Sequence, residues 1–302
     1  MCDDGTPVEI GWVFKPTGEM SVQYSIEALS PSDGSPIDPQ QNLNILQDLA
    51  IAGDCRDFDL SWARKCTQSL TWKSKLLPQN LERISQFFIG LYPPFCSQIV
   101  IASYILYPGI DLSRPNVGLK AYFFPSVRSK MTGTPAMDML TSTVGSLGMA
   151  LPWSKATRYF STLPQEYKIE PVIAAVDCVS AAENRLKVYV RTQATHLSAL
   201  CGMITLGGQL DGPAIDVTLA TLRELWRALF GPISDEAPVQ QHQSNKGPSG
   251  FLFYYEMALG NSSLIPKIYI PAARFLESDG HVARVISQFV GRSYSDDVRS
   301  LL

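Results

Sequence analysis

Three short segments of this 302-residue chain repeat one polar pattern within apolar surroundings, and this repeat is the strongest constraint on the fold. The segments are Lys120-Ala121-Tyr122, Lys187-Val188-Tyr189 and Lys267-Ile268-Tyr269. Residues i and i+2 of a β-strand point to the same face. Each segment is therefore predicted to be a strand with a cation and a phenol on one face and an aliphatic residue on the other.

The second copy shows the alternation along its whole length, from Arg185 to Arg191. Its odd positions are Arg, Lys, Tyr and Arg, whereas its even positions are Leu, Val and Val. A single strand exposed to solvent could show such a pattern. Because the pattern recurs, we expect the basic faces to meet and to line one cavity, which would be suited to an anion.

Amphipathic helical segments lie between the strand segments. The clearest runs from 215 to 230, where Val217, Leu222 and Trp226 recur near the helical period. Their apolar stripe needs a partner, and the apolar strand faces are the natural one. The sequence therefore predicts helices outside a sheet whose Lys/Tyr faces point inward, and such a sheet, when closed, has a polar lumen and no exposed edges.

Length and composition favour a single domain over residues 1–302. The net charge of −3 and the charged content of 18% give no overall attraction to nucleic acid or to an acidic membrane. No apolar run reaches the roughly 18 residues of a membrane span, and no signal peptide is recognisable at Met1. The 6 cysteines form no CxxC pair, which indicates free thiols in a reducing compartment, so we expect a cytoplasmic protein.

Periodicity and turn residues predict the individual elements. Strands are expected at 8–14, 22–29, 118–125, 168–178, 184–192, 250–259 and 266–270. Helices are expected at 43–49, 81–91, 136–149, 155–163, 215–230 and 282–290. The segment 98–106 is ambiguous, with residue preferences favouring a strand. The stretch from about 231 to 250 is rich in Pro, Gly, Ser and Gln, and we expect a mobile loop there.

Several segments, taken in order and spacing, resemble the fungal indole prenyltransferases of the dimethylallyltryptophan synthase family. These segments are 3–9, 119–125, 177–180, 185–191, 205–208 and 266–271. The resemblance implies an α+β fold, the αββα prenyltransferase fold, in which helices ring an antiparallel β-barrel of ten strands with a polar lumen. The reaction would take place inside this barrel. The resemblance also implies a chain shorter than the family at both ends. On that basis we expect an incomplete barrel with unpaired strand edges, which could self-associate or form a homodimer.

The resemblance implies a role for each candidate residue. Four cations would hold the diphosphate of the prenyl donor, namely Lys120, Arg185, Lys187 and Lys267. Three tyrosines would shield the prenyl cation with their π faces, namely Tyr122, Tyr189 and Tyr269. Glu9 would be catalytic, because it would accept the indole N–H and raise the nucleophilicity of the ring. Gln23 stands where the family usually has a diphosphate-binding arginine, so its role stays open.

The resemblance thus implies a prenyltransferase that moves a dimethylallyl group from dimethylallyl diphosphate to an indole, either of tryptophan or of a tryptophan-containing cyclic dipeptide. No cofactor or metal is expected, because DDxxD motifs do not occur in the sequence. Two alternatives stay open. One is a catalytically inactive, truncated homologue that at most binds diphosphate or aromatic ligands. The other is a non-catalytic barrel that carries an apolar ligand.

Overall fold

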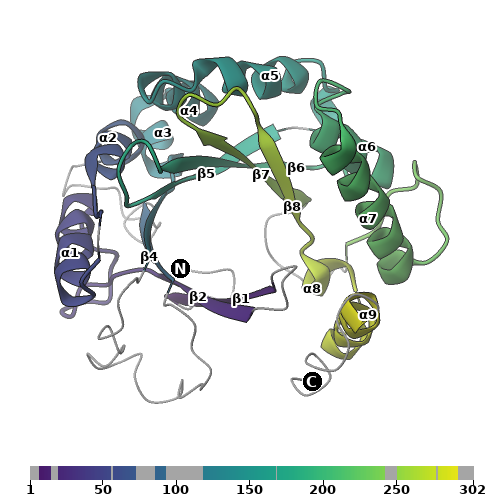
Figure 1. Ribbon diagram of the computed structural model, residues 1–302, viewed down its shortest axis with the longest axis horizontal. Helices are drawn as coiled ribbons and strands as arrows, with labels where there is room; N and C mark the ends of the chain where they lie inside the picture. The colour runs from purple at the N-terminus through teal and green to yellow at the C-terminus, as the bar shows by residue number, and fades with distance from the viewer. Residues whose placement is uncertain are drawn as a thin grey trace. The chain divides into compact units, whose positions relative to one another are not determined.

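The structure is a computed structural model that describes residues 7–14, 20–55, 57–72, 86–92, 118–167, 169–241, 250–276 and 278–291. The chain forms two compact units, and Figure 1 labels their elements in chain order. The first unit comprises Met1–Ala150, Pro171–Val188 and Glu256–Ser263, and the second comprises Leu151–Glu170, Tyr189–Tyr255 and Leu264–Leu302. That the whole chain is one domain stays a prediction.

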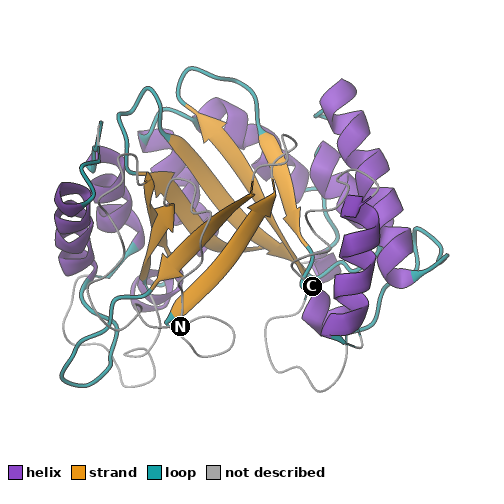
Figure 2. Ribbon diagram, turned by 60° about the horizontal axis from the view of Figure 1, so that its bottom comes forward, coloured by secondary structure: helices purple, strands orange, loops and turns teal. Residues whose placement is uncertain are grey.

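The described strands form one sheet in which each strand hydrogen-bonds its neighbours in sequence (orange in Figure 2). They are β1 (Val8–Phe14), β2 (Met20–Ile26), β3 (Phe87–Tyr92), β4 (Gly118–Phe123), β5 (Ile169–Asp177), β6 (Arg185–Thr192), β7 (Phe251–Ala258) and β8 (Ile265–Tyr269). The pairs from β1 to β5 are antiparallel. All the strands expected from the sequence are present, and β3 is an addition.

The helix predicted over 81–91 is wrong, because residues 87–92 form β3 between β2 and β4. Phe87, Ile89 and Leu91 are each 2% exposed, and Phe88 on the other face is 6% exposed. A strand buried on both faces shows a continuous apolar run instead of an alternation, so its period gives no strand signal. Residues 81–85 and the ambiguous segment 98–106 lie outside the described part of the chain.

The described helices are α1 (Pro39–Ala52), α2 (Ser61–Leu70), α3 (Ser126–Thr132), α4 (Ala136–Ser146), α5 (Ala150–Phe160), α6 (Leu197–Thr205), α7 (Pro213–Phe230), α8 (Ala272–Phe275) and α9 (Asp279–Gly291). In the first unit, α1 packs on β3 and α2 packs on β4. Helix α1 begins where the Asp38 side chain accepts the Gln40 N–H, with Pro39 at its first position. None of the helices in the described ranges is both long and apolar enough to cross a membrane.

The strand alternation predicted for 185–191 is present in β6. Leu186, Val188 and Val190 are 0% exposed, so the even positions belong to the core. Strand β7 behaves in the same way, since Phe253 and Tyr255 are 0% exposed. These faces bury the apolar area that stabilises the sheet, and the opposite faces are left to carry polar side chains.

Aromatic packing holds the core of the second unit together. Trp153 of α5 lies against Tyr255, with ring centroids 6.4 Å apart. The Tyr255 hydroxyl donates a hydrogen bond to the Met203 carbonyl at 2.9 Å, and burial raises the pKa of Tyr255 well above its usual value. Residues 232–241 contain neither helix nor strand, as expected for the predicted loop, while residues 242–249 lie outside the described ranges.

Gly250 is predicted to be required by the fold, because it has φ +88° and an added Cβ would overlap the Thr192 carbonyl oxygen. We expect Gly250→Ala to lower the unfolding free energy by about 2 kcal/mol or more in urea titrations. Gly260→Ala is the matched control, since Gly260 also has positive φ but open space around it. It should cost only about 1 kcal/mol. Equal losses in the two variants would contradict the steric explanation.

Candidate functional site

The strand register places a row of residues on one face of the first unit. Glu9 of β1 is opposite Ser25 of β2, and Ser25 is opposite Gly90 of β3. Gly90 is opposite Lys120 of β4, which is opposite Asp177 of β5. Residues directly opposite in an antiparallel sheet share a face, so Glu9 and Lys120 belong to the same one. The side chains in the middle of the row are small, because Ser25 and Gly90 separate Glu9 from Lys120.

Three predicted cations come together at the β5 end of this row. Lys120, Arg185 and Lys187 form a group that we call the basic cluster, and two carboxylates bridge it. Asp177 contacts Lys120 at 3.3 Å and Arg185 at 2.8 Å. Glu256 of β7 contacts Arg185 at 3.3 Å and Lys187 at 3.5 Å. The cluster is therefore a chain of alternating charges that crosses β4, β5, β6 and β7.

The side chain of Arg185 is the most exposed of the cluster, at 44%, compared with 13% for Lys120 and 10% for Lys187. Partial burial disfavours its charged form, but Asp177 and Glu256 outweigh that effect and raise the pKa of Arg185. A guanidinium has five N–H donors, and these two carboxylates engage only part of them. Arg185 can therefore present further donors to an anion while its own position stays fixed.

Lys187 is the most strongly perturbed cation of the cluster. Burial, followed by repulsion from Lys120, lowers its pKa from 10.5 to about 8, although Asp177 and Glu256 act in the opposite direction. Repulsion from Arg185 adds to the lowering. A buried lysine among like charges gains interaction energy when an anion arrives, so the cluster is suited to a multiply charged ligand such as a phosphate ester.

A second group lies in the second unit. Tyr189 of β6, Tyr254 of β7 and Tyr269 of β8 form a tyrosine cluster with ring centroids 5.0 to 6.1 Å apart. Lys267 lies over the Tyr254 ring, with its Nζ 5.4 Å from the centroid. This contact indicates that the tyrosine faces attract a cation. Lys267 is thus part of the tyrosine cluster, and the basic cluster contains the other three predicted cations.

The remaining candidates lie on the strands of the first unit. Tyr122 is half-buried on β4, two residues after Lys120 and therefore on its face. Gln23 is half-buried on β2, where it is opposite Gly11. Glu9 is exposed and lies diagonally from Gln23 on the same face. The ligand-binding roles of Tyr122, Gln23 and Glu9 stay predictions.

Three members of the clusters have no role in the sequence-based prediction, namely Asp177, Tyr254 and Glu256. The alternation in β7 carries a signal for two of them. Tyr254 and Glu256 occupy the face opposite to the buried Phe253 and Tyr255, so they are an aromatic and a charged residue at i and i+2. The pattern parallels Lys-x-Tyr with an acid in place of the lysine. Asp177 shows no such pattern in the sequence, because its contact with Lys120 depends on the pairing of β5 with β4.

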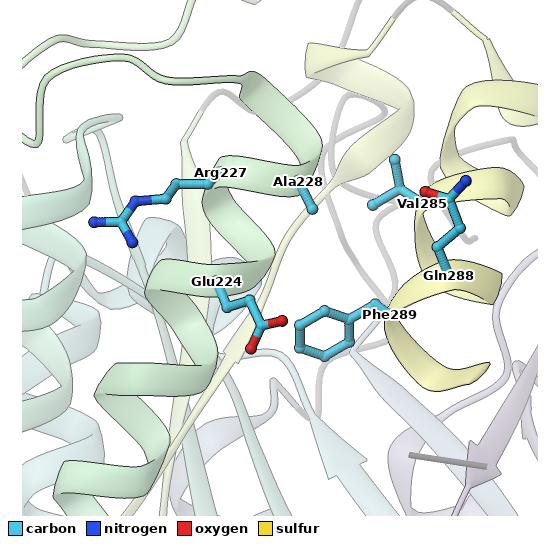
Figure 3. A pocket seen from close by; sticks show the side chains of 6 residues that line it. All are labelled: Glu224, Arg227, Ala228, Val285, Gln288 and Phe289. Carbon is cyan, nitrogen blue, oxygen red and sulfur yellow. The ribbon is translucent and has the colours of Figure 1, made fainter. Parts of the chain in front are cut away.

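A pocket of about 270 Å³ lies elsewhere, between α7 and α9 of the second unit (Figure 3). Its lining consists of Glu224, Arg227, Ala228, Val285, Gln288 and Phe289. Figure 3 shows the Glu224 carboxylate pointing toward the Phe289 ring, whereas Arg227 points away from it. The pocket includes none of the predicted site residues, so it is separate from the candidate site.

Solved structures with similar folds define the class. The chain superposes on AnaPT from Neosartorya fischeri with a TM-score of 0.70 and 21% identity, over 95% of this chain and 65% of that one. It superposes on NotF, solved in complex with brevianamide F and DMSPP, with a TM-score of 0.70 and 21% identity, over 96% of this chain and 67% of that one. The predicted fold class, the αββα prenyltransferase fold, is confirmed.

The family is established by sequence. Residues 1–300 match the model of the tryptophan dimethylallyltransferase family, and the chain belongs to this family. It is 29% identical to the 4-O-dimethylallyl-L-tyrosine synthase of Claviceps purpurea, over 100% of this chain and 68% of the relative. It is 30% identical to the 7-dimethylallyltryptophan synthase of Aspergillus fumigatus, over 60% of this chain and 40% of the relative. The chain thus spans about two thirds of the length of a relative that matches it from end to end.

The lowered pKa of Lys187 predicts a pH dependence of stability. Between about pH 8 and pH 10.4 the unfolded chain binds a proton that the folded protein does not, so this lysine makes the unfolding free energy rise with pH. The contribution of this lysine to the slope of the unfolding free energy against pH cannot exceed about 1.4 kcal/mol per pH unit. Buried thiols act in the opposite direction, since burial raises the pKa of Cys66 to about 12. We therefore expect the difference in unfolding free energy between wild type and Lys187→Met to move in favour of wild type as pH rises. A difference that is constant with pH would contradict this prediction.

Proposed function

We propose that this protein is an aromatic prenyltransferase that uses dimethylallyl diphosphate as its donor. The observation that carries the proposal is the basic cluster, in which Lys120, Arg185 and Lys187 converge on one face of the sheet. Membership of the tryptophan dimethylallyltransferase family supports it independently. The alternative of an inactive homologue that only binds ligands is an outcome of the test below.

The donor reacts by breaking its allylic C–O bond, and the diphosphate leaves with the electron pair. The leaving group carries several negative charges, so fixed cations that receive it lower the barrier. In this proposal Lys120, Arg185 and Lys187 bind the diphosphate by charge-assisted hydrogen bonds, and Lys267 contributes a further cation. Gln23 is a neutral hydrogen-bonding group for the same ligand.

The allylic cation that remains must be kept from water until the acceptor attacks it. We assign this role to tyrosine faces, because a ring quadrupole attracts a cation without acting as a strong nucleophile. Tyr189 and Tyr269 lie in the tyrosine cluster, and Tyr122 shares the face of Lys120. Tyr254, which contacts both rings of the cluster, takes the same role.

The acceptor forms the new bond with its ring carbon, and the ring then loses a proton. Glu9 accepts a hydrogen bond from the acceptor N–H in this proposal, which raises the electron density of the ring in the transition state. We propose an indole acceptor, either tryptophan or a tryptophan-containing cyclic dipeptide. NotF, a relative in fold, was solved with brevianamide F and DMSPP.

A tyrosine acceptor is the second candidate. The relative that aligns with 100% of this chain is a 4-O-dimethylallyl-L-tyrosine synthase. With tyrosine the new bond is C–O, and Glu9 would accept the phenolic proton in place of the indole N–H hydrogen bond. The same carboxylate thus suits either acceptor, and only competition between acceptors separates the two.

We further propose that the reaction needs no metal or cofactor and takes place in the cytosol. Lysine and arginine provide the counter-charge for the diphosphate that a divalent ion supplies in other enzymes. Cys55, Cys66, Cys178 and Cys201 are free thiols, in keeping with a reducing compartment. Pairing with a second copy of the chain stays a prediction.

The decisive experiment incubates the protein with dimethylallyl diphosphate and either tryptophan, a tryptophan-containing cyclic dipeptide or tyrosine, with and without EDTA. We expect a product heavier by one dimethylallyl group, formed at the same rate with the chelator. Mass spectrometry of the product identifies the acceptor. Donor binding without any product would favour the inactive homologue, and activity lost only with EDTA would overturn metal independence.

Two variants separate the roles of the acceptor and donor residues. Glu9→Gln should lower kcat while the affinity for the donor stays unchanged, because it removes the negative charge and leaves an amide oxygen that still accepts the acceptor N–H. Lys187→Ala should weaken donor binding by about 1.5–3 kcal/mol, the cost of losing one charge-assisted hydrogen bond. Calorimetric titration with a non-hydrolysable donor analogue measures the affinities. An unchanged kcat in Glu9→Ala, which removes the accepting oxygen as well, would remove Glu9 from the mechanism.

A further inference from the structure

We propose that Asp177 and Glu256 are positioning residues, which hold the three cations of the basic cluster in the arrangement that receives diphosphate. This inference rests on the proposed function in one respect, since the anion is taken to be the donor's diphosphate. The two carboxylates carry negative charge and would by themselves repel an anionic ligand. Their contacts with the cations of the basic cluster explain why they lie there.

The two carboxylates connect cations from different strands. Asp177 lies directly opposite Lys120 in the register of β4 and β5, and it also accepts a hydrogen bond from Arg185 of β6 at 2.8 Å. Glu256 reaches from β7 to Arg185 and Lys187. Each carboxylate thus contacts two cations, and Arg185 is shared between them. Without these contacts, long lysine and arginine side chains would sample many rotamers, and the arrangement that stabilises the leaving diphosphate would be populated less often.

The geometry leaves Arg185 able to bind an anion. Its Nε donates to Asp177 and its Nη1 donates to Glu256 at 3.3 Å, so the contacts with these carboxylates do not engage Nη2. A guanidinium is planar, and fixing two of its edges also fixes the direction of the remaining N–H groups. Arg185 is therefore oriented by carboxylates and still able to donate to diphosphate.

The charges of the cluster predict which effect each carboxylate has on the ligand. Three cations and two carboxylates leave a net charge of about +1, so a carboxylate weakens the attraction for an anion. Against this loss, it keeps Lys187 protonated. The described charged groups that act on Lys187 include Lys120 of β4, Asp177 of β5, Arg185 of β6 and Glu256 of β7. The two acids raise the pKa of Lys187, and the two bases lower it.

A purely structural ion-pair network would behave differently. Its loss would change stability, but the dependence of diphosphate affinity on pH would stay the same. Buried ion pairs contribute little net stability in general, because desolvation offsets their attraction. The side chains of Asp177 and Glu256 are 11% and 13% exposed, which places them in this regime. The pH profile of binding is therefore the measurement that separates the two explanations.

The test titrates the full chain with inorganic diphosphate in a calorimeter at intervals from about pH 6.5 to about pH 9.5, with wild type, Glu256→Gln and Asp177→Asn. Wild-type affinity should fall as pH rises through the pKa of Lys187, near 8. In both variants the fall should begin about one pH unit or more lower, since Asp177 and Glu256 each raise the pKa of Lys187 and a nearby opposite charge shifts a pKa by about that amount. Near pH 6.5 the variants should bind at least as tightly as wild type, yet their kcat for prenyl transfer should fall at least tenfold.

Glu170→Gln is the matched control. Glu170 pairs with Arg191 at 3.7 Å, which also links β5 to β6 but lies in the second unit. Its profile should coincide with that of wild type. Diphosphate itself titrates in this range and affects every protein equally. The decisive quantity is therefore the shift along the pH axis between the affinity profile of a variant and that of wild type.

Each outcome has one meaning. Profiles of Glu256→Gln and Asp177→Asn that coincide with wild type, or affinities that drop equally at every pH, would overturn the positioning role. If neither variant folds in thermal unfolding experiments, the carboxylates serve the fold and the proposal is equally overturned. Diphosphate binding with the expected profiles but no prenyl transfer by wild type would refute the proposed function and leave this inference standing.

Discussion

Like charges repel on a shared face, and the candidate site depends on how the sheet overcomes this repulsion. Lys187 is buried and lies close enough to Lys120 that burial and this like charge lower the pKa of Lys187. Asp177 and Glu256 lie between the cations and offset that cost. Each of the three cations of the cluster therefore has a carboxylate beside it.

The alternation of β6 and β7 allows this arrangement to coexist with a firm core. Val188 and Tyr255 belong to faces that are fully buried, while Lys187 and Glu256 occupy the opposite faces of the same strands. Apolar burial stabilises the strands, so the polar face can be selected for chemistry and not for stability. The packed face also fixes the backbone from which the charged side chains extend.

The proposed chemistry requires both an anion-binding group and aromatic faces. The basic cluster lies in the first unit and the tyrosine cluster in the second. Strand β6 contributes Lys187 to one and Tyr189 to the other, two residues apart along the chain.

The sequence by itself determined the strand alternation, most elements and the family, since these depend on local periodicity and on residues that are read in order. It determined that Lys120, Arg185 and Lys187 are candidates for one site. Only the tertiary structure decided that 87–92 is a strand, because burial on both faces removes the period that would reveal it. It also decided the partners of the cations. Asp177 is far from Lys120 in sequence, and the register of β4 against β5, which depends on long-range pairing, brings the two together.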